Sequence, residues 1–263
     1  MKYALITGGT SGIGFAMAGE FLDRGYGVIL ASSSRKNLAI AKRKLEVKKS
    51  KIVKSTKQII IIEQDLSISG GAEKLYHKVK TLGTDVEIVV NNAGFGLFGN
   101  FTETDLSKEL NMIDINIKAV HILTKLFLKD MKRKNKGYIL NVASSAAFQS
   151  GPLMATYYST KSYVYRLTEA INYENKKDKV NVQVSCLCPG PVDTNFNKVA
   201  GVRFSVKPLK ADYVAKYAID QMLKGKMLII PGFKMKCAKF FGRFVSDKKL
   251  MSITYRIQKK KVK

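Results

Sequence analysis

Three side chains whose types could perform acid–base chemistry stand near the middle of the chain: Ser144, Tyr157 and Lys161. Ser144 lies thirteen residues before Tyr157, and Lys161 lies four residues after it. If this stretch is helical, Tyr157 and Lys161 share a helix face, because side chains four residues apart are neighbours there. A cation beside a phenol favours phenolate and lowers a pKa that starts near ~10. The spacing predicts Tyr157 as a general acid/base, whereas Tyr-x-x-x-Lys alone also occurs on ordinary helix surfaces.

The elements that must position these side chains alternate between strands and helices. Short apolar runs predict strands at residues 2–7, 26–33, 58–65, 87–90, 138–144, 180–187 and 227–230. Helical periodicity predicts helices near residues 12–24, 36–46, 71–82, 105–132, 156–175 and 210–223. Seven strands alternating with six helices predict an α/β fold, a single doubly wound domain whose seven-stranded parallel sheet is flanked by helices.

A glycine-rich segment, Thr7 to Gly14 with the sequence TGGTSGIG, follows the first predicted strand and opens the first predicted helix. Backbone amides and the helix dipole can bind a pyrophosphate there, and glycines let the phosphate approach the backbone closely. Doubly wound sheets bind ligands beyond the carboxyl ends of their strands, where Ser144 is also expected. The segment therefore predicts a dinucleotide site next to Ser144 and Tyr157.

Six motifs in order make the chain resemble the short-chain dehydrogenase/reductase family from about Lys2 to Ile230. They are the segment 7–14, Asn91-Asn92-Ala93-Gly94, Asn116 within IDINIKA, Ser144, Tyr157 with Lys161, and Pro189-Gly190-Pro191-Val192-Asp193-Thr194. The resemblance implies an NAD(P)-binding Rossmann fold in which residues 1–231 form the dinucleotide-binding catalytic domain. It also implies a substrate lid at about residues 195–210. Residues 232–263 would follow as a C-terminal extension.

The resemblance implies four catalytic residues: Asn116, Ser144, Tyr157 and Lys161. In the family, the tyrosine protonates the carbonyl oxygen during reduction, and the serine hydrogen-bonds that oxygen. The lysine holds the nicotinamide ribose and lowers the pKa of the phenol, while the asparagine orders a water that resupplies the proton. The implied cofactor-binding residues are Gly8, Thr10, Ser11, Gly12, Ile13, Gly14, Ser33, Ser34, Arg35, Asp65, Leu66, Asn92, Ala93, Gly94, Tyr157, Lys161, Pro189, Gly190, Val192 and Thr194.

The choice between NAD(H) and NADP(H) depends on the end of the second strand, where an acid would accept hydrogen bonds from the ribose of NAD. The run Ala31 to Lys36, ASSSRK, contains no acid, and Arg35 could pair with a 2′-phosphate. NADP(H) is therefore favoured over NAD(H). Two observations leave NAD(H) open: Arg35 could simply start a solvated helix, and Ser11 stands where many NADP-preferring members carry a basic residue. Asp65, which resembles the family's adenine contact, could instead cap the next helix.

The residues expected at the substrate are almost wholly apolar. Ser144, Leu153, Met154, Tyr157 and Phe196 are the predicted substrate contacts. Further candidates for the wall and lid are Phe95, Leu97, Phe98, Val199, Val202, Phe204 and Val206. Such a wall favours a lipophilic ketone or aldehyde, such as a fatty-acyl, steroid-like or isoprenoid compound, over a sugar.

Composition excludes several other classes of protein. The N-terminus lacks the apolar core of a secretory signal, and no stretch has the 18 or more apolar residues of a membrane span, so a cytoplasmic protein is predicted. The three cysteines and two histidines have no metal-ligand spacing, so no metal is expected, and buried thiols are predicted. The net charge of +26 comes from lysines spread along the chain, which argues against a nucleic-acid patch.

The C-terminal extension is both basic and amphipathic. From Lys226 to Lys263 there are twelve Lys or Arg residues and one acid, so this segment supplies +11 of the net charge. Apolar residues fall on one helix face at Cys237, Phe240, Phe241, Phe244 and Val245, and on a second at Leu250, Ile253 and Ile257. Three roles remain open: contact with an anionic membrane, a cover over the substrate pocket, and an interface in a dimeric or tetrameric homo-oligomer.

Two functions from different classes are consistent with the sequence. The first is an NADP(H)-dependent oxidoreductase that interconverts a carbonyl and an alcohol, with Tyr157 as general acid/base. The second is a catalytically idle cofactor-binding protein that acts through its basic extension at a membrane or nucleic acid. The presence of Asn116, Ser144, Tyr157 and Lys161 together favours the enzyme, since an idle site has no need of all four.

Overall fold

The computed structural model describes residues 1–48, 58–196 and 207–259. Seven short apolar segments form one parallel sheet in the order β3-β2-β1-β4-β5-β6-β9. Its strands are β1 (Lys2–Thr7), β2 (Gly27–Ser32), β3 (Ile59–Glu63), β4 (Asp85–Asn91), β5 (Gly137–Val142), β6 (Val182–Leu187) and β9 (Leu228–Ile229). The seven-stranded doubly wound sheet is therefore confirmed. The strand order reverses between β1 and β4, where such folds open a ligand crevice.

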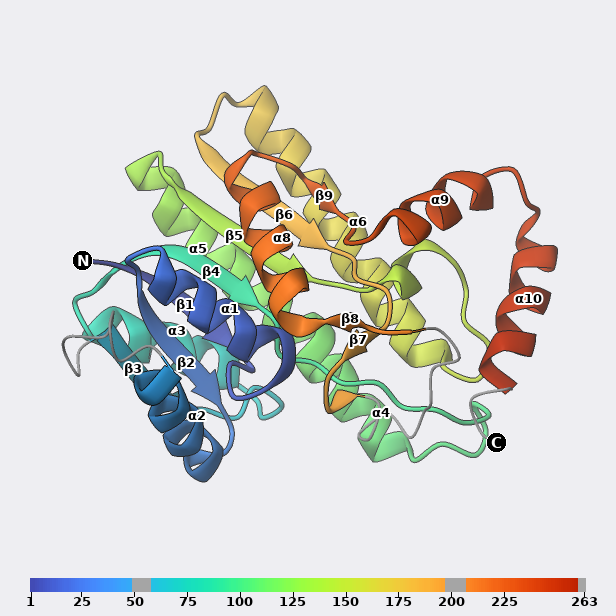
Figure 1. Ribbon diagram of the computed structural model, residues 1–263, viewed down its shortest axis with the longest axis horizontal. Helices are drawn as coiled ribbons and strands as arrows, with labels where there is room; N and C mark the ends of the chain where they lie inside the picture. The colour runs from blue at the N-terminus through green and yellow to red at the C-terminus, as the bar shows by residue number, and fades with distance from the viewer. Residues whose placement is uncertain (49–57, 197–206, 260–263) are drawn as a thin grey trace.

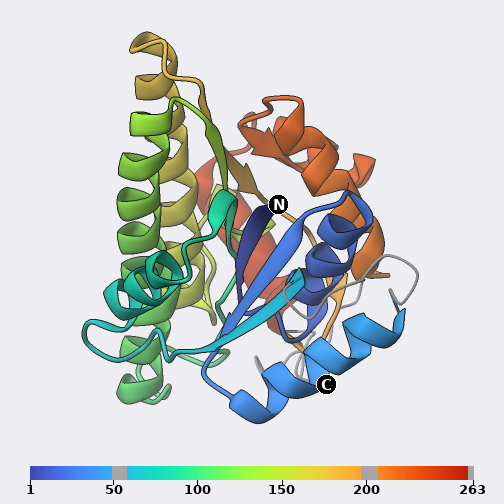
Figure 2. The same ribbon diagram turned by 90° about the vertical axis from the view of Figure 1, so that its left-hand side faces the viewer.

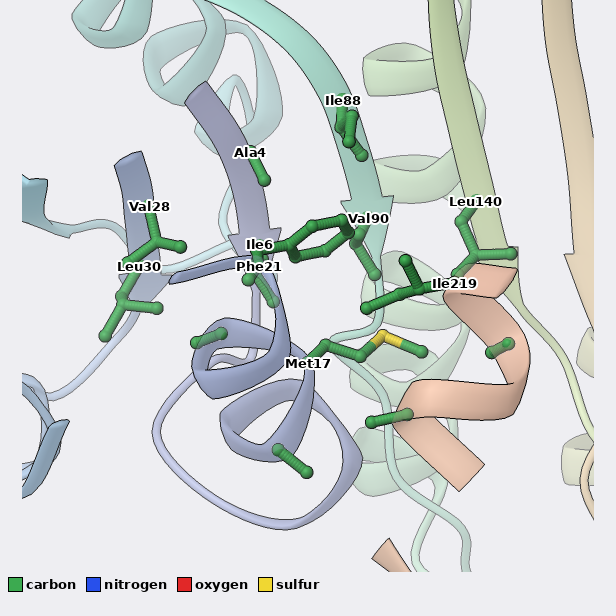
Figure 3. Close-up of a cluster of buried hydrophobic side chains, with 14 of the residues drawn as sticks. Ala4, Ile6, Met17, Phe21, Val28, Leu30, Ile88, Val90, Leu140 and Ile219 are labelled. Atoms are coloured by element: carbon green, nitrogen blue, oxygen red, sulfur yellow. The ribbon is translucent and has the colours of Figure 1, made fainter. Parts of the chain in front are cut away.

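Helices cover both faces of the sheet (Figure 2). One face carries α1 (Gly12–Asp23), α2 (Arg35–Lys48) and α8 (Ala211–Leu223), and the other carries α3 (Gly71–Thr81), α5 (Val120–Lys134) and α6 (Ala155–Lys177). Side chains alternate along each strand, so Ala4 and Ile6 of β1 face the first group, whereas Tyr3 and Leu5 face the second. Figure 3 shows Met17, Phe21 and Ile219 packed on the first of these faces, the one to which Ala4 and Ile6 point. Burial on both faces explains the continuous apolar runs of the strands.

The long helix expected near residues 105–132 is divided into three parts. It consists of α4 (Leu106–Ile113), a π-helical segment η2 (Asp114–Ala119) and α5. π-helical turns within α-helices are rare and frequently mark functional sites. Asn116 lies in this π-helical segment. The sequence predicted a helix here but did not predict its change from α-helical to π-helical hydrogen bonding.

The remaining elements lie near the carboxyl ends of the central strands. A short 3-10 turn, η3 (Ser145–Phe148), follows β5, and a two-stranded parallel ladder pairs β7 (Val192–Asp193) with β8 (Leu209–Lys210). The C-terminal extension forms α9 (Phe233–Gly242) and α10 (Asp247–Lys259) outside the sheet, on the right in Figure 1. No helix in the described residues is long and apolar enough to cross a membrane.

Candidate active site

Ser144, Tyr157 and Lys161 line one cavity of about 400 Å³ beyond the carboxyl ends of β5 and β6. Ser144 follows β5, and its Oγ accepts a 3.1 Å hydrogen bond from the backbone N–H of Ala146. The Ser144 hydroxyl also hydrogen-bonds Tyr157. Tyr157 and Lys161 come from the first turns of α6, with the Lys161 Nζ 5.8 Å from the centre of the Tyr157 ring. The shared helix face predicted for these two residues is thus present.

The electrostatics of the pair differ from the sequence-based expectation. Burial raises the pKa of Tyr157 above its ordinary value, and the hydrogen bond from Ser144 acts in the opposite direction. Burial also lowers the pKa of Lys161 to about 8. Its Nζ donates a 3.0 Å hydrogen bond to the Val142 carbonyl. The expected lowering of the phenol's pKa is therefore wrong for this arrangement, because desolvation of the phenolate outweighs the hydrogen bond from Ser144.

Asn116 is buried and held by hydrogen bonds on both sides of its amide. Its Nδ2 donates to the Phe95 carbonyl at 2.9 Å and to Thr160 Oγ1 at 3.1 Å, and its Oδ1 accepts from the Phe95 N–H at 3.1 Å. These bonds join η2 to α6 and to the segment after β4. Asn116 therefore holds the backbone around Phe95 and the helix that carries Lys161.

The glycine-rich segment closes one end of the same cavity. Gly8 and Gly12 adopt positive φ angles of 64° and 55°, which favour glycine. Asn92 Nδ2 donates to the Thr7 and Gly8 carbonyls at 2.9 and 3.1 Å, and so joins the ends of β1 and β4. A Cβ at Gly14 would lie 2.5 Å from this Asn92 nitrogen. The tight turn and the Asn92 contact explain why glycine is needed here.

The cavity has the shape and donors that a nicotinamide cofactor needs. The glycine-rich segment lines one side, and Asn92, Ala93, Gly94, Pro189, Gly190, Val192 and Thr194 border the rest with Lys161 and Tyr157. A Cβ at Gly94 would lie 2.7 Å from Asn116 Oδ1 and 3.3 Å from Lys161 Nζ, so glycine keeps this space open. The residues present therefore fit a dinucleotide whose nicotinamide end lies beside Lys161 and Tyr157.

The residues predicted for the adenosine end lie outside this cavity, at the ends of β2 and β3. Ser33 and Arg35 are exposed, and the partly buried Ser34 accepts a 3.3 Å hydrogen bond at Oγ from the Asn37 N–H. Leu66 packs against the core face formed with α3. Asp65 Oδ1 accepts from the Ser67 N–H and hydroxyl at 2.8 and 2.7 Å. It shapes the turn after β3 but does not cap α3, whose N-cap is Gly70.

Sequence reasoning missed an acid beside the predicted 2′-phosphate site. Glu63 ends β3 and pairs in register with Ser32 at the end of β2. Its Oε1 accepts a hydrogen bond of 3.3 Å from the Arg35 backbone N–H. Only strand pairing brings Glu63 next to Arg35. The second strand carries no acid at its end, but Glu63 of the neighbouring strand β3 supplies one at the same place.

The predicted substrate contacts gather as an apolar wall beside the tyrosine. Met154 and Phe196 line the cavity, and the rings of Phe196 and Tyr157 are 5.4 Å apart. Phe95, Leu97 and Phe98 pack into the same cluster. Leu153 does not line the cavity; it adopts a positive φ of 66°, and its carbonyl accepts from the Gly99 N–H at 2.9 Å. The candidates Val199, Val202, Phe204 and Val206, with most of the predicted lid, lie outside the described residues.

Sequence comparison identifies the family to which these features belong. Residues 2–202 match the family described as short chain dehydrogenase. The chain belongs to this family. It is therefore an oxidoreductase that interconverts alcohol and carbonyl groups with a nicotinamide cofactor.

Several relatives align with most of this short-chain dehydrogenase. An oxidoreductase from Staphylococcus saprophyticus is 28% identical over 84% of this chain and 92% of its own. The very-long-chain 3-oxoacyl-CoA reductase-B of Danio rerio is 33% identical, and the 17-beta-hydroxysteroid dehydrogenase type 3 of Mus musculus is 30% identical. Both alignments cover 75% of this chain and 62% of the relative.

Solved structures share the fold. The chain superposes with a TM-score of 0.80 on a short-chain dehydrogenase from Sphingobium yanoikuyae in complex with NADPH, at 21% identity and 96% coverage of both chains. A family member from Burkholderia phymatum in complex with NAD gives 0.79 at 24% identity, with 90% and 91% coverage. These likenesses support the Rossmann-type architecture.

Two further parts of this dehydrogenase support or line the active site through contacts that the sequence analysis did not predict. Asn91, Thr124, Asn141 and Thr168 form a buried hydrogen-bonded network that links β4, α5, β5 and α6 beneath the cavity. Ile257 of α10 lines the cavity itself. Their roles depend on contacts between distant segments, which local patterns do not encode.

Helix α10 is joined by hydrogen bonds to α6 and to the residue that follows η3. Gln258 Nε2 donates to the hydroxyl of Tyr158 at 2.7 Å, and Gln149 Nε2 donates to Thr254 Oγ1 at 2.5 Å. Both Thr254 and Gln258 are buried. Among the three roles left open by the sequence, these contacts favour a cover over the pocket for α10.

Proposed function

We propose that this dehydrogenase interconverts a carbonyl and an alcohol on a lipophilic substrate, preferentially with NADP(H), and that Tyr157 is the general acid/base. The observation that carries the proposal is the single cavity that joins the glycine-rich segment, the Ser144, Tyr157 and Lys161 side chains and an apolar wall. A substrate carbonyl next to Tyr157 would lie between the hydroxyl groups of Ser144 and Tyr157 on one side and a bound nicotinamide on the other.

The proton chemistry follows from the pKa directions. Because burial raises the pKa of Tyr157, its phenol carries a proton at neutral pH and can give it to the carbonyl oxygen. Ser144 is held against the phenol and can donate to the same oxygen as negative charge develops there. The reduced nicotinamide supplies the hydride when it is bound. Lys161, fixed by the Val142 carbonyl, is placed to hold the cofactor ribose.

The proposed substrate class rests on the wall of the cavity. Met154, Phe196 and Ile257 line the same cavity as Tyr157 and contribute apolar side chains to it. Such a site suits a fatty-acyl or steroid-like ketone, which needs only one oxygen hydrogen-bonded. Two relatives, a very-long-chain 3-oxoacyl-CoA reductase and a hydroxysteroid dehydrogenase, carry names that agree with this class.

The proposed cofactor preference rests on the exposed end of β2. Ser33, Ser34 and Arg35 offer hydroxyl and guanidinium donors for a 2′-phosphate. Glu63 opposes this preference, because its carboxylate hydrogen-bonds the Arg35 backbone and would repel a second anion. We infer that the arginine outweighs the acid, because only its guanidinium can pair bidentately with phosphate.

The test compares two neighbouring tyrosines. We expect Tyr157→Phe to lower the rate at which a panel of lipophilic ketones is reduced with NADPH by about 10² to 10⁴-fold, the usual range for losing a general acid. NADPH binding, followed by fluorescence, should stay close to that of the unmodified protein. Tyr158→Phe is the matched control, because Tyr158 also lines the cavity but has no lysine four residues later. It should retain most of the turnover.

Two results would contradict the proposal. Unchanged turnover in Tyr157→Phe would show that Tyr157 is not the general acid/base. NADPH binding without turnover of any ketone or alcohol in the panel would favour the idle cofactor-binding protein instead.

A further inference from the structure

Helix α9 and the residues directly after it turn their phenylalanine side chains toward solvent. Phe233, Phe240, Phe241 and Phe244 are 79%, 55%, 63% and 76% exposed, respectively. The rings of Phe241 and Phe244 lie 5.4 and 5.6 Å from that of Phe240, so these three side chains form a continuous group. No residue of α9 is buried. An amphipathic helix normally turns its apolar face to the protein, so this orientation leaves the face for another partner.

The opposite side of α9 holds the helix on the protein. Met235 packs against Gly190, where an added Cβ would lie 2.8 Å from the Met235 Cγ. Lys239 lies over the rings of Phe148 and Tyr165, with its Nζ at 5.3 and 5.8 Å from their centres. These contacts fix which side faces outward. The exposed aromatic group therefore follows from the packing of Met235 and Lys239.

Positive charge surrounds the aromatic group. Between Phe233 and Lys259 the chain carries eight basic residues and one acid, Asp247. Lys234, Arg243, Lys248 and Lys249 are all exposed on or directly after α9. A second copy of this chain would place the same basic surface against itself, which is unfavourable. An anionic lipid surface matches both properties, because it attracts the basic residues and accepts aromatic rings at its interface.

We propose that the α9 surface, defined by Phe233, Phe240, Phe241 and Phe244 with the basic residues around them, docks this dehydrogenase on anionic membranes. α10 follows α9 directly and contributes Ile257 to the cavity. Docking through α9 thus holds the apolar cavity near lipid, where a lipophilic substrate is concentrated. This last consequence rests on the proposed function, whereas docking itself does not.

The test measures co-sedimentation of the full chain with two kinds of vesicle, in the absence of cofactor and substrate. Vesicles of phosphatidylcholine mixed with phosphatidylserine should bind the protein, and vesicles of phosphatidylcholine alone should bind it much less. Binding should weaken as NaCl is raised, because salt screens the lysines and arginines. The measurement is independent of activity, so a failed substrate assignment would leave its result unchanged.

Two sets of variants separate the aromatic from the charged contribution. Replacing Phe240, Phe241 and Phe244 with Ser should reduce binding by about tenfold or more, since three exposed rings would no longer enter the interface. Phe101→Ser with Leu106→Ser is the matched control, because both side chains are 67% exposed on another segment. Lys248→Gln with Lys249→Gln should also weaken binding, whereas Lys176→Gln with Lys177→Gln, at the far end of α6, should have less effect.

Three outcomes would overturn the proposal. The first is a wild-type protein that does not sediment with anionic vesicles. The second is equal binding by the triple Ser variant and the wild type. The third is a wild-type oligomer, seen by light scattering, that the triple variant converts to a monomer without any vesicle binding. That result would make the α9 surface a subunit interface.

Discussion

At the scale of single residues, the environment of a side chain decides its chemistry more than its sequence neighbours do. Lys161 lies on the same helix face as Tyr157, yet burial raises the pKa of the tyrosine. The same burial lowers the pKa of Lys161 to about 8, which leaves its ammonium group mostly charged at pH 7. The phenol is thus protonated at neutral pH, which is the state that carbonyl reduction requires.

Glu63 provides a test of cofactor preference at the residue scale. We expect Glu63→Gln to raise the ratio of kcat/KM for NADPH over NADH by about tenfold, because a carboxylate near the 2′-phosphate is removed. Arg35→Ala should lower the same ratio. Steady-state kinetics with both cofactors measures the two effects.

Glu46→Gln serves as the control for Glu63→Gln. Glu46 lies near the C-terminal end of α2 and pairs with Lys42 in the same helix. Its replacement should leave the ratio unchanged. If neither Glu63→Gln nor Arg35→Ala alters the ratio, the preference is set elsewhere in the site.

At the scale of elements, two helical segments, η2 and α10, contribute to the active site through where they place their side chains. The π-helical η2 places Asn116 where its amide hydrogen-bonds both Phe95 and Thr160. Helix α10 crosses the active-site side of the molecule, held by Gln258 on Tyr158 and Thr254 on Gln149. Both elements therefore connect the substrate side of the cavity to α6.

The position of Ile257 predicts a role for α10 in substrate binding. We expect Ile257→Ala to raise KM for a bulky lipophilic ketone by about fivefold, because about three half-buried carbon atoms are removed from the cavity wall. The KM for a small ketone and for NADPH should change little. Ile253→Ala is the matched control, since Ile253 is also on α10 and does not line the cavity. Equal effects of the two variants on KM would argue against α10 as a cover.

At the scale of the whole molecule, the doubly wound sheet brings distant motifs to one edge. β1 lies between β2 and β4, and β5 and β6 follow on one side, so the ends of β1, β4, β5 and β6 lie in a row (Figure 1). The glycine-rich segment, Asn92, Ser144 and the Pro189–Thr194 stretch each follow one of these ends. Oligomerisation and the division of the chain at residue 231 stay predictions.

The net charge of +26 predicts a salt-dependent stability of the whole molecule. Like charges repel one another in the folded state, and added salt screens this repulsion. We expect the melting temperature to rise as NaCl is increased from about 0.01 to about 0.15 M, over which the Debye length falls from ~30 to ~8 Å.

A variant of lower charge tests the cause of this salt dependence. Lys176→Glu with Lys177→Glu should melt with a weaker dependence on NaCl, since both residues lie on the exposed end of α6. KCl should reproduce the NaCl curve if screening is the cause. A melting temperature that falls with salt would show that ion pairs, such as those of Glu87 with Lys2 and Lys136, outweigh the repulsion.

The sequence by itself determined the fold class and the sheet of seven strands, and it brought Tyr157 and Lys161 forward as candidate catalytic residues. These follow from local physics: continuous apolar runs require burial on both faces, glycines with positive φ permit a phosphate-binding turn, and side chains four apart share a helix face. Each of these signals lies within a few residues of the feature it predicts. That is why Tyr157, Lys161 and Gly12 could be identified without coordinates.

Only the tertiary structure decided how distant segments meet. Glu63 reaches Arg35 through the pairing of β2 with β3, and Ile257 reaches the cavity through the docking of α10. The amphipathic pattern of α9 was readable, yet its outward orientation is set by Met235 on Gly190 and Lys239 on two aromatic rings. The burial that raises the pKa of Tyr157 likewise results from the packing of several elements around its ring. Such contacts join residues far apart in the chain, so no local pattern encodes them.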